Sequence, residues 1–301
     1  MVSPFLFWPV FAGIIFLAIG LFAVRKELSA SPGLDKLLVL ARVFVATPLA
    51  VFGAEHLAGA RFIMQVVPAW MPARLFWTYF VGVALIAAAL SLVLTKYVRV
   101  SSMLLGIMFV LFVLMIHLPN VAANPRDRIL WAVALRDLSF AGGAFALAAT
   151  KTRQWREGIS NALLLIARAF VAFPLLFFAV EHILHPQFAP GVPLPKLTPA
   201  SVPFPHVLAT IVAAFLLVAG VCLLIGKYAR TTTTWLGLVL VLLTFLFYLP
   251  ILAVARQSAQ ITEGLNYVAD TMLFAGMVLF LAAAMPSDKP SAALWANVSD
   301  L

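Results

Sequence analysis

The chain has 301 residues, of which 64% are hydrophobic and only 10% are charged, and its mean hydropathy is +1.09. Soluble domains carry about 25% charged residues, so this sequence cannot cover itself with polar surface in water and predicts an integral membrane protein in contact with the lipid bilayer. The net charge of +9 lies mostly in short loops between apolar runs, which is typical of membrane proteins and excludes nucleic acid as the partner. The single cysteine, Cys222, excludes chemistry that needs a thiol pair.

Nine apolar stretches are each long enough to cross a bilayer, which takes about 20 residues. They cover residues 5–24, 37–56, 75–95, 100–118, 129–149, 159–182, 207–226, 232–249 and 264–285. The first stretch has no basic residues before it and is followed by Arg25 and Lys26, so we interpret it as an uncleaved anchor and not as a signal peptide. The pattern predicts an all-α, polytopic membrane helix bundle.

Lysine and arginine are divided unequally between the two sides that these stretches define. One side holds eleven of these residues, the other holds six, and three lie within the stretches. Positive residues are enriched on the cytoplasmic side of membrane proteins. We therefore expect a bacterial-type inner-membrane protein with a periplasmic N-terminus and a cytoplasmic C-terminus.

A sixteen-residue segment occurs twice, at residues 41–56 and 167–182, with ten identical positions at an offset of 126. Further matches follow in the same order, between residues 96–99 and 227–230 at an offset of 131, and between residues 140–142 and 274–276 at an offset of 134. Because four stretches separate the copies, we interpret them as parallel repeats of a four-helix unit.

These matches divide the chain into five parts. The predicted parts are an anchor with its loop at 1–36, a first repeat at 37–150, a cytoplasmic linker at 151–162, a second repeat at 163–285 and a cytoplasmic tail at 286–301. The second repeat has the longer outer loop, residues 186–205, which contains seven prolines. Such a loop cannot be helical, and we expect it to lie over the outer face as a stiff, extended cover.

All five histidines fall at the predicted outer face, where imidazole rings could bind a cofactor or relay protons. They are His56, His117, His182, His185 and His206. Glu55 and Glu181 precede two of them, each in the last turn of an apolar helix, where the helix dipole disfavours a negative charge. Each glutamate therefore needs a cation, a proton or a ligand. No histidine spacing along one helix indicates a metal site.

Arg136 is the expected cation for Glu55, in a structural ion pair within the first repeat. The alignment of residues 140–142 with 274–276 places Asp270 at the position of Arg136 and opposite Glu181. An alternative register matches Asp270 with Asp137 instead. In the first register the second repeat holds two acids and no arginine, and two close carboxylates can share a proton or hold a cation.

Each repeat resembles the DoxX-like family of membrane proteins. The resemblance lies in an arginine embedded in an apolar helix that ends in a polar pair before a proline-containing loop, which here is Arg42 with Glu55 and His56, and Arg168 with Glu181 and His182. The segment from Arg136 to Gly143 is similar to the fourth helix of that family. The chain departs from the family in its tandem duplication and in its Glu-His pair. The resemblance implies a four-helix unit linked to membrane redox complexes that use quinone.

We expect the functional surface at the outer face. The leading hypothesis is a membrane subunit that supports quinone-linked redox chemistry at the periplasmic face, with quinone favoured over haem and with a periplasmic or membrane redox partner. We expect the second repeat to carry the active site, with Glu181, His182 and Asp270 as catalytic residues. The expected cofactor-binding residues are Glu55, His56, His117, His185 and His206. The alternatives are a permease for a small solute and a non-catalytic scaffold for a periplasmic partner.

Overall fold

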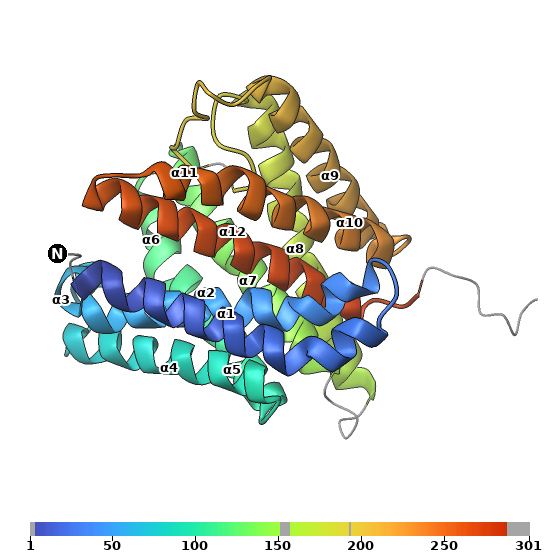
Figure 1. Cartoon of the computed structure of the whole chain (residues 1–301), viewed down its shortest axis with the longest axis horizontal. Coiled ribbons are helices and arrows are strands. Elements are labelled where there is room, and N and C mark those ends of the chain that lie inside the picture. The colour runs from blue at the N-terminus through green and yellow to red at the C-terminus, as the bar shows by residue number, and fades with distance from the viewer. Residues whose placement is uncertain (1–3, 151–156, 193, 288–301) are drawn as a thin grey trace, which may run out of the picture.

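The computed structural model describes residues 4–150, 157–192 and 194–287 (Figure 1). Within these ranges the chain is helical, and its one β-type contact is an isolated bridge between Phe188 and Leu197. The described residues form nine helical segments that are long and apolar enough to cross a membrane. This confirms the predicted all-α polytopic bundle. Most of the expected tail, and residues 151–156 of the expected linker, lie outside the described residues.

The elements follow the predicted stretches closely. Their bounds are α1 Pro4–Ala30, α2 Asp35–Ala58, α3 Ala60–Ile63, α4 Arg74–Leu94, α5 Val98–Phe112, η1 Val113–His117, α6 Leu118–Ala123, α7 Arg128–Thr150, α8 Glu157–Leu184, α9 Pro205–Ile225, α10 Ala229–Leu242, η2 Leu243–Tyr248, α11 Leu249–Val254 and α12 Ser258–Ala284. Here η1 and η2 are π-helical turns that continue α5 and α10.

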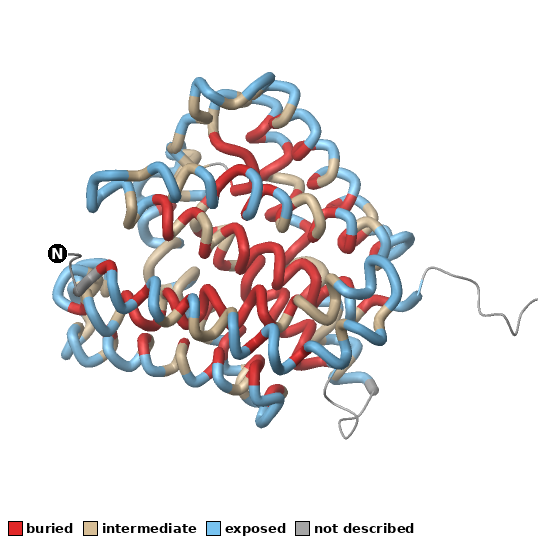
Figure 2. Tube along the Cα trace, in the orientation of Figure 1, coloured by how far each residue is buried: buried red, intermediate tan, exposed pale blue. Residues whose placement is uncertain are grey.

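The outside of the bundle is apolar. Figure 2 shows the buried residues gathered in the middle and the exposed ones around them. Large hydrophobic side chains are among the exposed ones, for example Phe22, Val83 and Leu246. In water such a surface would be costly, whereas lipid tails are as apolar as these side chains. The protein is therefore an integral membrane protein whose outer surface contacts lipid.

The two repeats exchange partners instead of closing into separate bundles. The first helix of the first repeat, α2, packs against the last helix of the second repeat, α12, and α7 packs in the same way against α8. Figure 1 shows α12 lying alongside α2. Among the described residues, α2 and α7 make no close backbone contact, although both belong to the first repeat. The helices α7 and α12 contact each other at the centre.

Glycines make this exchange possible. A Cβ atom on Gly142 of α7 would lie 2.8 Å from the carbonyl oxygen of Ala167 in α8. At the equivalent place, a Cβ atom on Gly276 of α12 would lie 3.0 Å from the backbone nitrogen of Val45 in α2. Both distances are too short for a side chain, so the absence of a Cβ lets each pair of backbones approach closely. The matching contacts give the molecule an approximate two-fold symmetry.

The π-helical turns occur at equivalent positions of the two repeats. In each, a backbone N–H bonds to the carbonyl five residues earlier, from Leu118 to Val113 in η1 and from Leu249 to Thr244 in η2. A proline follows each turn, and a proline ring clashes with the preceding turn of a regular α-helix. The wider turn relieves this clash. His117 and Tyr248 end the two turns.

Candidate functional site

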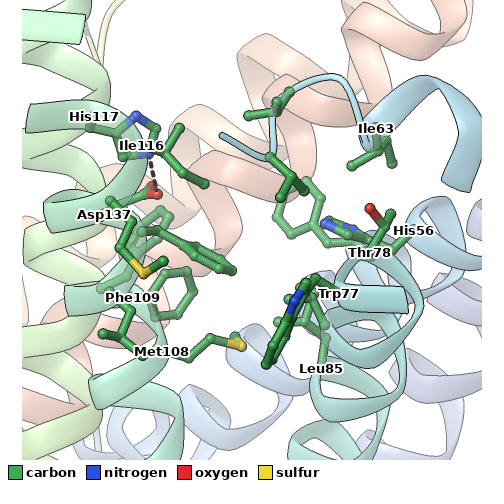
Figure 3. A pocket seen from close by; sticks show the side chains of 18 of the residues that line it. His56, Ile63, Trp77, Thr78, Leu85, Met108, Phe109, Ile116, His117 and Asp137 are labelled. Carbon is green, nitrogen blue, oxygen red and sulfur yellow. Dashed lines mark hydrogen bonds and ion pairs between the residues drawn. The ribbon is translucent and has the colours of Figure 1, made fainter. Parts of the chain in front are cut away.

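A cavity of about 520 Å³, which we call the first-repeat cavity, lies between helices of the first repeat and α12 of the second (Figure 3). Side chains from α2, α3, α4, α5, η1, α7 and α12 line it, together with the loop that follows α3. Its walls are mainly apolar and aromatic, with Trp77, Met108 and Phe109 among them. The size and the lining are typical of sites for small organic ligands.

The cavity reaches the surface of the bundle at α4 and α5. Phe80 of α4 and Leu111 of α5 both line it, yet they are 52% and 45% exposed on the surface of the bundle. That part of the surface is apolar and faces lipid. The cavity therefore borders the lipid-facing surface of the bundle at these two helices.

A network of charged residues forms the polar end of the cavity. His117 Nε2 lies 2.9 Å from Asp137 Oδ2, and Figure 3 shows this contact as a dashed line. Because a carboxylate accepts hydrogen bonds, His117 donates from Nε2. Arg136 donates from Nε and Nη2 to Asp137 Oδ1, at 3.1 Å in each case, and from Nη1 to Asp270 Oδ2 at 2.7 Å. The carboxylates thus hold both the arginine and the histidine in place.

Glu55 and His56 border the same cavity at the end of α2. The amide of Asn266 in α12 faces the Glu55 carboxylate. Because a carboxylate accepts hydrogen bonds, we assign the NH₂ group to this side, where it donates to the two oxygens over 2.8 and 3.1 Å. Among the described residues, no cation forms an ion pair with Glu55. His56 donates from Nδ1 to the Phe52 carbonyl, which lies 2.7 Å away.

The expected ion pair between Arg136 and Glu55 is absent, and the glutamate that pairs with an arginine is Glu181 instead of Glu55. Arg136 pairs with Asp137 and Asp270, whereas Glu181, expected to lack an arginine, accepts from Arg128 Nη1 at 3.0 Å. The exchange of helices between the repeats is the reason. Each glutamate meets the last helix of the other repeat, which is α12 for Glu55 and α7 for Glu181.

The same exchange decides the position of Asp270. The alignment places Asp270 at the position of Arg136, and the structure brings these two equivalent residues together across the approximate two-fold axis. Phe140 and Phe274, also equivalent, meet there with ring centroids 6.4 Å apart. Asp270 therefore lines the first-repeat cavity and does not lie beside Glu181.

In the second repeat, the proline-rich loop fills the corresponding space. Tyr248, at the position of His117, is 1% exposed and donates its hydroxyl hydrogen to the Pro190 carbonyl over 2.5 Å. The N–H of Gly191 donates to His182 Nε2 over 2.9 Å. Residues 189–192 are all buried. The expected extended cover is thus wrong in part, because the loop folds back on itself and inserts its tip between the helices.

The last two histidines lie outside the first-repeat cavity. His185 packs edge-on against Phe188, with ring centroids 6.1 Å apart. His206 is exposed near the start of α9. The parts of the chain that the structure describes contain no group of three or more His, Cys, Asp or Glu side chains able to hold a metal ion.

Sequence reasoning missed two partners of the glutamates. Asn266 lies four residues before Asp270, so both face the same side of α12. This spacing of polar residues in an apolar stretch was a usable signal. Arg128 opens α7, one residue before the predicted stretch 129–149, and no local pattern links it to Glu181, because the contact depends on how the two repeats pack.

These features define a polytopic all-α membrane protein with an apolar cavity that borders the lipid-facing surface and ends in a His-Asp-Arg network. The family described as Domain of unknown function (DUF8561) matches residues 45–134. The match covers α4, α5 and most of α2, which supply much of the cavity wall. No curated protein and no solved structure matches the chain.

Proposed function

We propose that the protein binds a lipid-soluble quinone in the first-repeat cavity and acts as a membrane subunit of quinone-linked redox chemistry. One observation carries the proposal: the His117–Asp137 pair, with its 2.9 Å hydrogen bond, lies at the polar end of a cavity that borders the lipid-facing surface. A histidine backed by a carboxylate is an efficient proton acceptor and donor, because the carboxylate orients the ring and stabilises its charged form.

The residues of the cavity fit a quinone. A quinone ring is flat and apolar with polar oxygens at its edge, and it carries a long apolar tail. The aromatic walls suit the ring, and Phe80 and Leu111 border the opening through which a tail would extend into lipid. His56 and His117 supply polar groups at the closed end. A bound quinone would supply two-electron, two-proton chemistry.

The chain's own residues would position the ligand and move protons. Asp137 holds the His117 ring by its Nε2, which leaves Nδ1 to exchange a proton. Arg136 accompanies Asp137 and Asp270, so the two carboxylates keep a counter-ion when His117 is neutral. Glu55 and Asn266 close the same end of the cavity and keep it polar.

We also propose that the two repeats are DoxX-like units in a bacterial-type inner membrane, with the cavity toward the periplasm and a periplasmic or membrane redox partner. The tandem order of eight helices after one anchor supports this proposal. A reporter that is active only in the cytoplasm tests the orientation. It should be active when fused after Leu301 and silent when inserted into residues 197–202, and the opposite pattern would overturn the assignment.

The packing favours a binding site over a permease. A second cavity, lined by Glu27, Arg42 and Arg230 among others, lies at the opposite end of the bundle. On α12, residues 274–279 separate the two cavities, and all six are buried. This packed layer leaves no path for a solute along α12 between the cavities.

Retention of native ligand tests the proposed function. The protein is extracted in mild detergent, and bound quinone is measured by mass spectrometry. We expect quinone in the wild type and in His185→Leu, whose histidine lies outside the cavity. We expect little in Met108→Trp, which fills the cavity, or in His117→Leu, with melting temperatures confirming that each variant folds. Absence of quinone from the wild type, or equal retention in the folded Met108→Trp variant, would overturn the proposal.

A further inference from the structure

The second repeat shows what its histidine binds. His182 donates from Nδ1 to the Phe178 carbonyl at 2.6 Å. Because a carbonyl only accepts, the hydrogen is on Nδ1, and Nε2 of the neutral ring carries a lone pair. This Nε2 accepts the N–H of Gly191 at 2.9 Å. The loop thus presents a hydrogen-bond donor to the histidine.

In the first repeat the histidine makes the same backbone hydrogen bond, but no loop tip reaches its other nitrogen. His56 donates from Nδ1 to the Phe52 carbonyl at 2.7 Å, so Nε2 of the neutral ring is again an acceptor. His56 lines the first-repeat cavity, and no hydrogen bond among the described residues engages its Nε2. The outer loop of the first repeat is shorter, and its residues Val67 and Met71, with Ile63 of α3, form a wall of the cavity instead of filling it.

The tip of the loop in the second repeat makes a second hydrogen bond, to Tyr248. The carbonyl of Pro190 and the N–H of Gly191 belong to one planar peptide bond, held between Tyr248 and His182. The equivalent residues in the first repeat are His117 and His56. Tyr248 donates to its ligand, whereas a neutral His117 has already used its N–H on Asp137 and offers an acceptor at Nδ1. Two acceptors therefore border the first-repeat cavity.

We infer that the ligand of this cavity is a planar molecule that donates a hydrogen bond to His56 Nε2, and that the site holds the hydroxyl-bearing quinol form more tightly than the quinone. The inference rests on the proposed function and names the redox form that the site selects. A quinol donates from its hydroxyl groups, whereas a quinone only accepts and would leave the His56 nitrogen without a partner. A buried acceptor without a donor has lost its water without gaining a hydrogen bond, which weakens the binding of the ligand.

Three probes with one ring and one tail test this inference. They are a decyl-substituted benzohydroquinone, the corresponding benzoquinone, and the dimethyl ether of the hydroquinone, which cannot donate. Their affinities for the detergent-purified chain are measured anaerobically, with a mild reductant present for the hydroquinone. We expect the hydroquinone to bind about tenfold more tightly than either other probe, which is the effect of one buried hydrogen bond.

Variants test whether the preference for the hydroquinone depends on His56. In His56→Phe the preference for the hydroquinone over its dimethyl ether should be smaller than in the wild type, because only His117 Nδ1 remains as an acceptor. His56→Gln, which keeps an acceptor, should retain more of the preference than His56→Phe. His206→Phe, at an exposed site outside the cavity, should behave as the wild type. Equal or tighter binding of the benzoquinone by the wild type, or an unchanged preference in His56→Phe, would overturn this inference and leave the proposed function standing. Failure of all three probes to bind would overturn both.

Discussion

Arg136 is the residue on which most of the buried charge depends. It donates to Asp137 and to Asp270, and Asp137 in turn holds His117. Arg136→Leu would leave both carboxylates without their cation, and we expect a loss of about 3–5 kcal/mol in the free energy of unfolding. Asp270→Asn should cost less, since Arg136 keeps Asp137.

A double-mutant cycle checks this expectation. Thermal melts in one detergent compare Arg136→Leu, Asp270→Leu and the double variant. The double variant should recover part of the loss, because it removes a charge and its counter-ion together. Strictly additive losses would show that the two side chains do not stabilise each other.

The two glutamates differ in their partners, and this difference predicts different responses to the same substitution. Glu181→Gln removes the charge that holds Arg128 at 3.0 Å, and we expect a loss of about 1–3 kcal/mol in stability. Glu55→Gln should destabilise less, since a glutamine oxygen still accepts from Asn266. Melting temperatures of both variants in the same detergent provide the measurement. A larger loss for Glu55→Gln would contradict the pairing.

At the scale of elements, the outer loops distinguish the two repeats. The loop of the second repeat is anchored at Phe188, whose ring lies 4.0 Å below the Arg128 guanidinium, and at its buried tip. Gly191 has a φ of +113°, which L side chains rarely adopt. A glycine at this position therefore lets the tip turn and present its N–H to His182.

Removing one hydroxyl should loosen this loop. In Tyr248→Phe the buried Pro190 carbonyl loses its donor, and we expect a loss of about 1–3 kcal/mol. Hydrogen exchange measured by mass spectrometry should speed up over residues 187–198. Tyr228→Phe is the matched control, since Tyr228 is 66% exposed. Unchanged exchange in Tyr248→Phe would show that the loop does not depend on this contact.

At the scale of the whole molecule, the exchange of helices makes the repeats depend on each other. Gly142→Ala and Gly276→Ala lie in different repeats, but each would force apart a contact between the repeats. We expect a loss of about 1–3 kcal/mol from each by overpacking. Gly158→Ala should cause no loss, because no atom lies within 4 Å of its Cβ position. Unchanged melting temperatures in both Gly142→Ala and Gly276→Ala would contradict the close packing.

Much of the fold could be predicted from the sequence, because it depends on local patterns. Within the described part of the chain, the nine helices long and apolar enough to span follow from runs of apolar residues, and the two repeats follow from identities at nearly constant offsets. The site was predictable in part. The sequence brought Glu55, His56, His117 and Asp270 to attention as polar residues in apolar helices, and the structure places all four around one cavity.

The sequence by itself determined the membrane class, the helices and the positions of the polar residues, because the hydrophobic effect and backbone hydrogen bonding act on local segments. Only the tertiary structure decided which buried polar side chains contact each other. The repeats exchange their helices, so Glu55 meets Asn266 and Arg136 meets Asp270. The proline-rich loop fills one of two equivalent spaces, since its five additional residues let its tip reach between the helices. Contacts between segments far apart in the chain leave no local pattern.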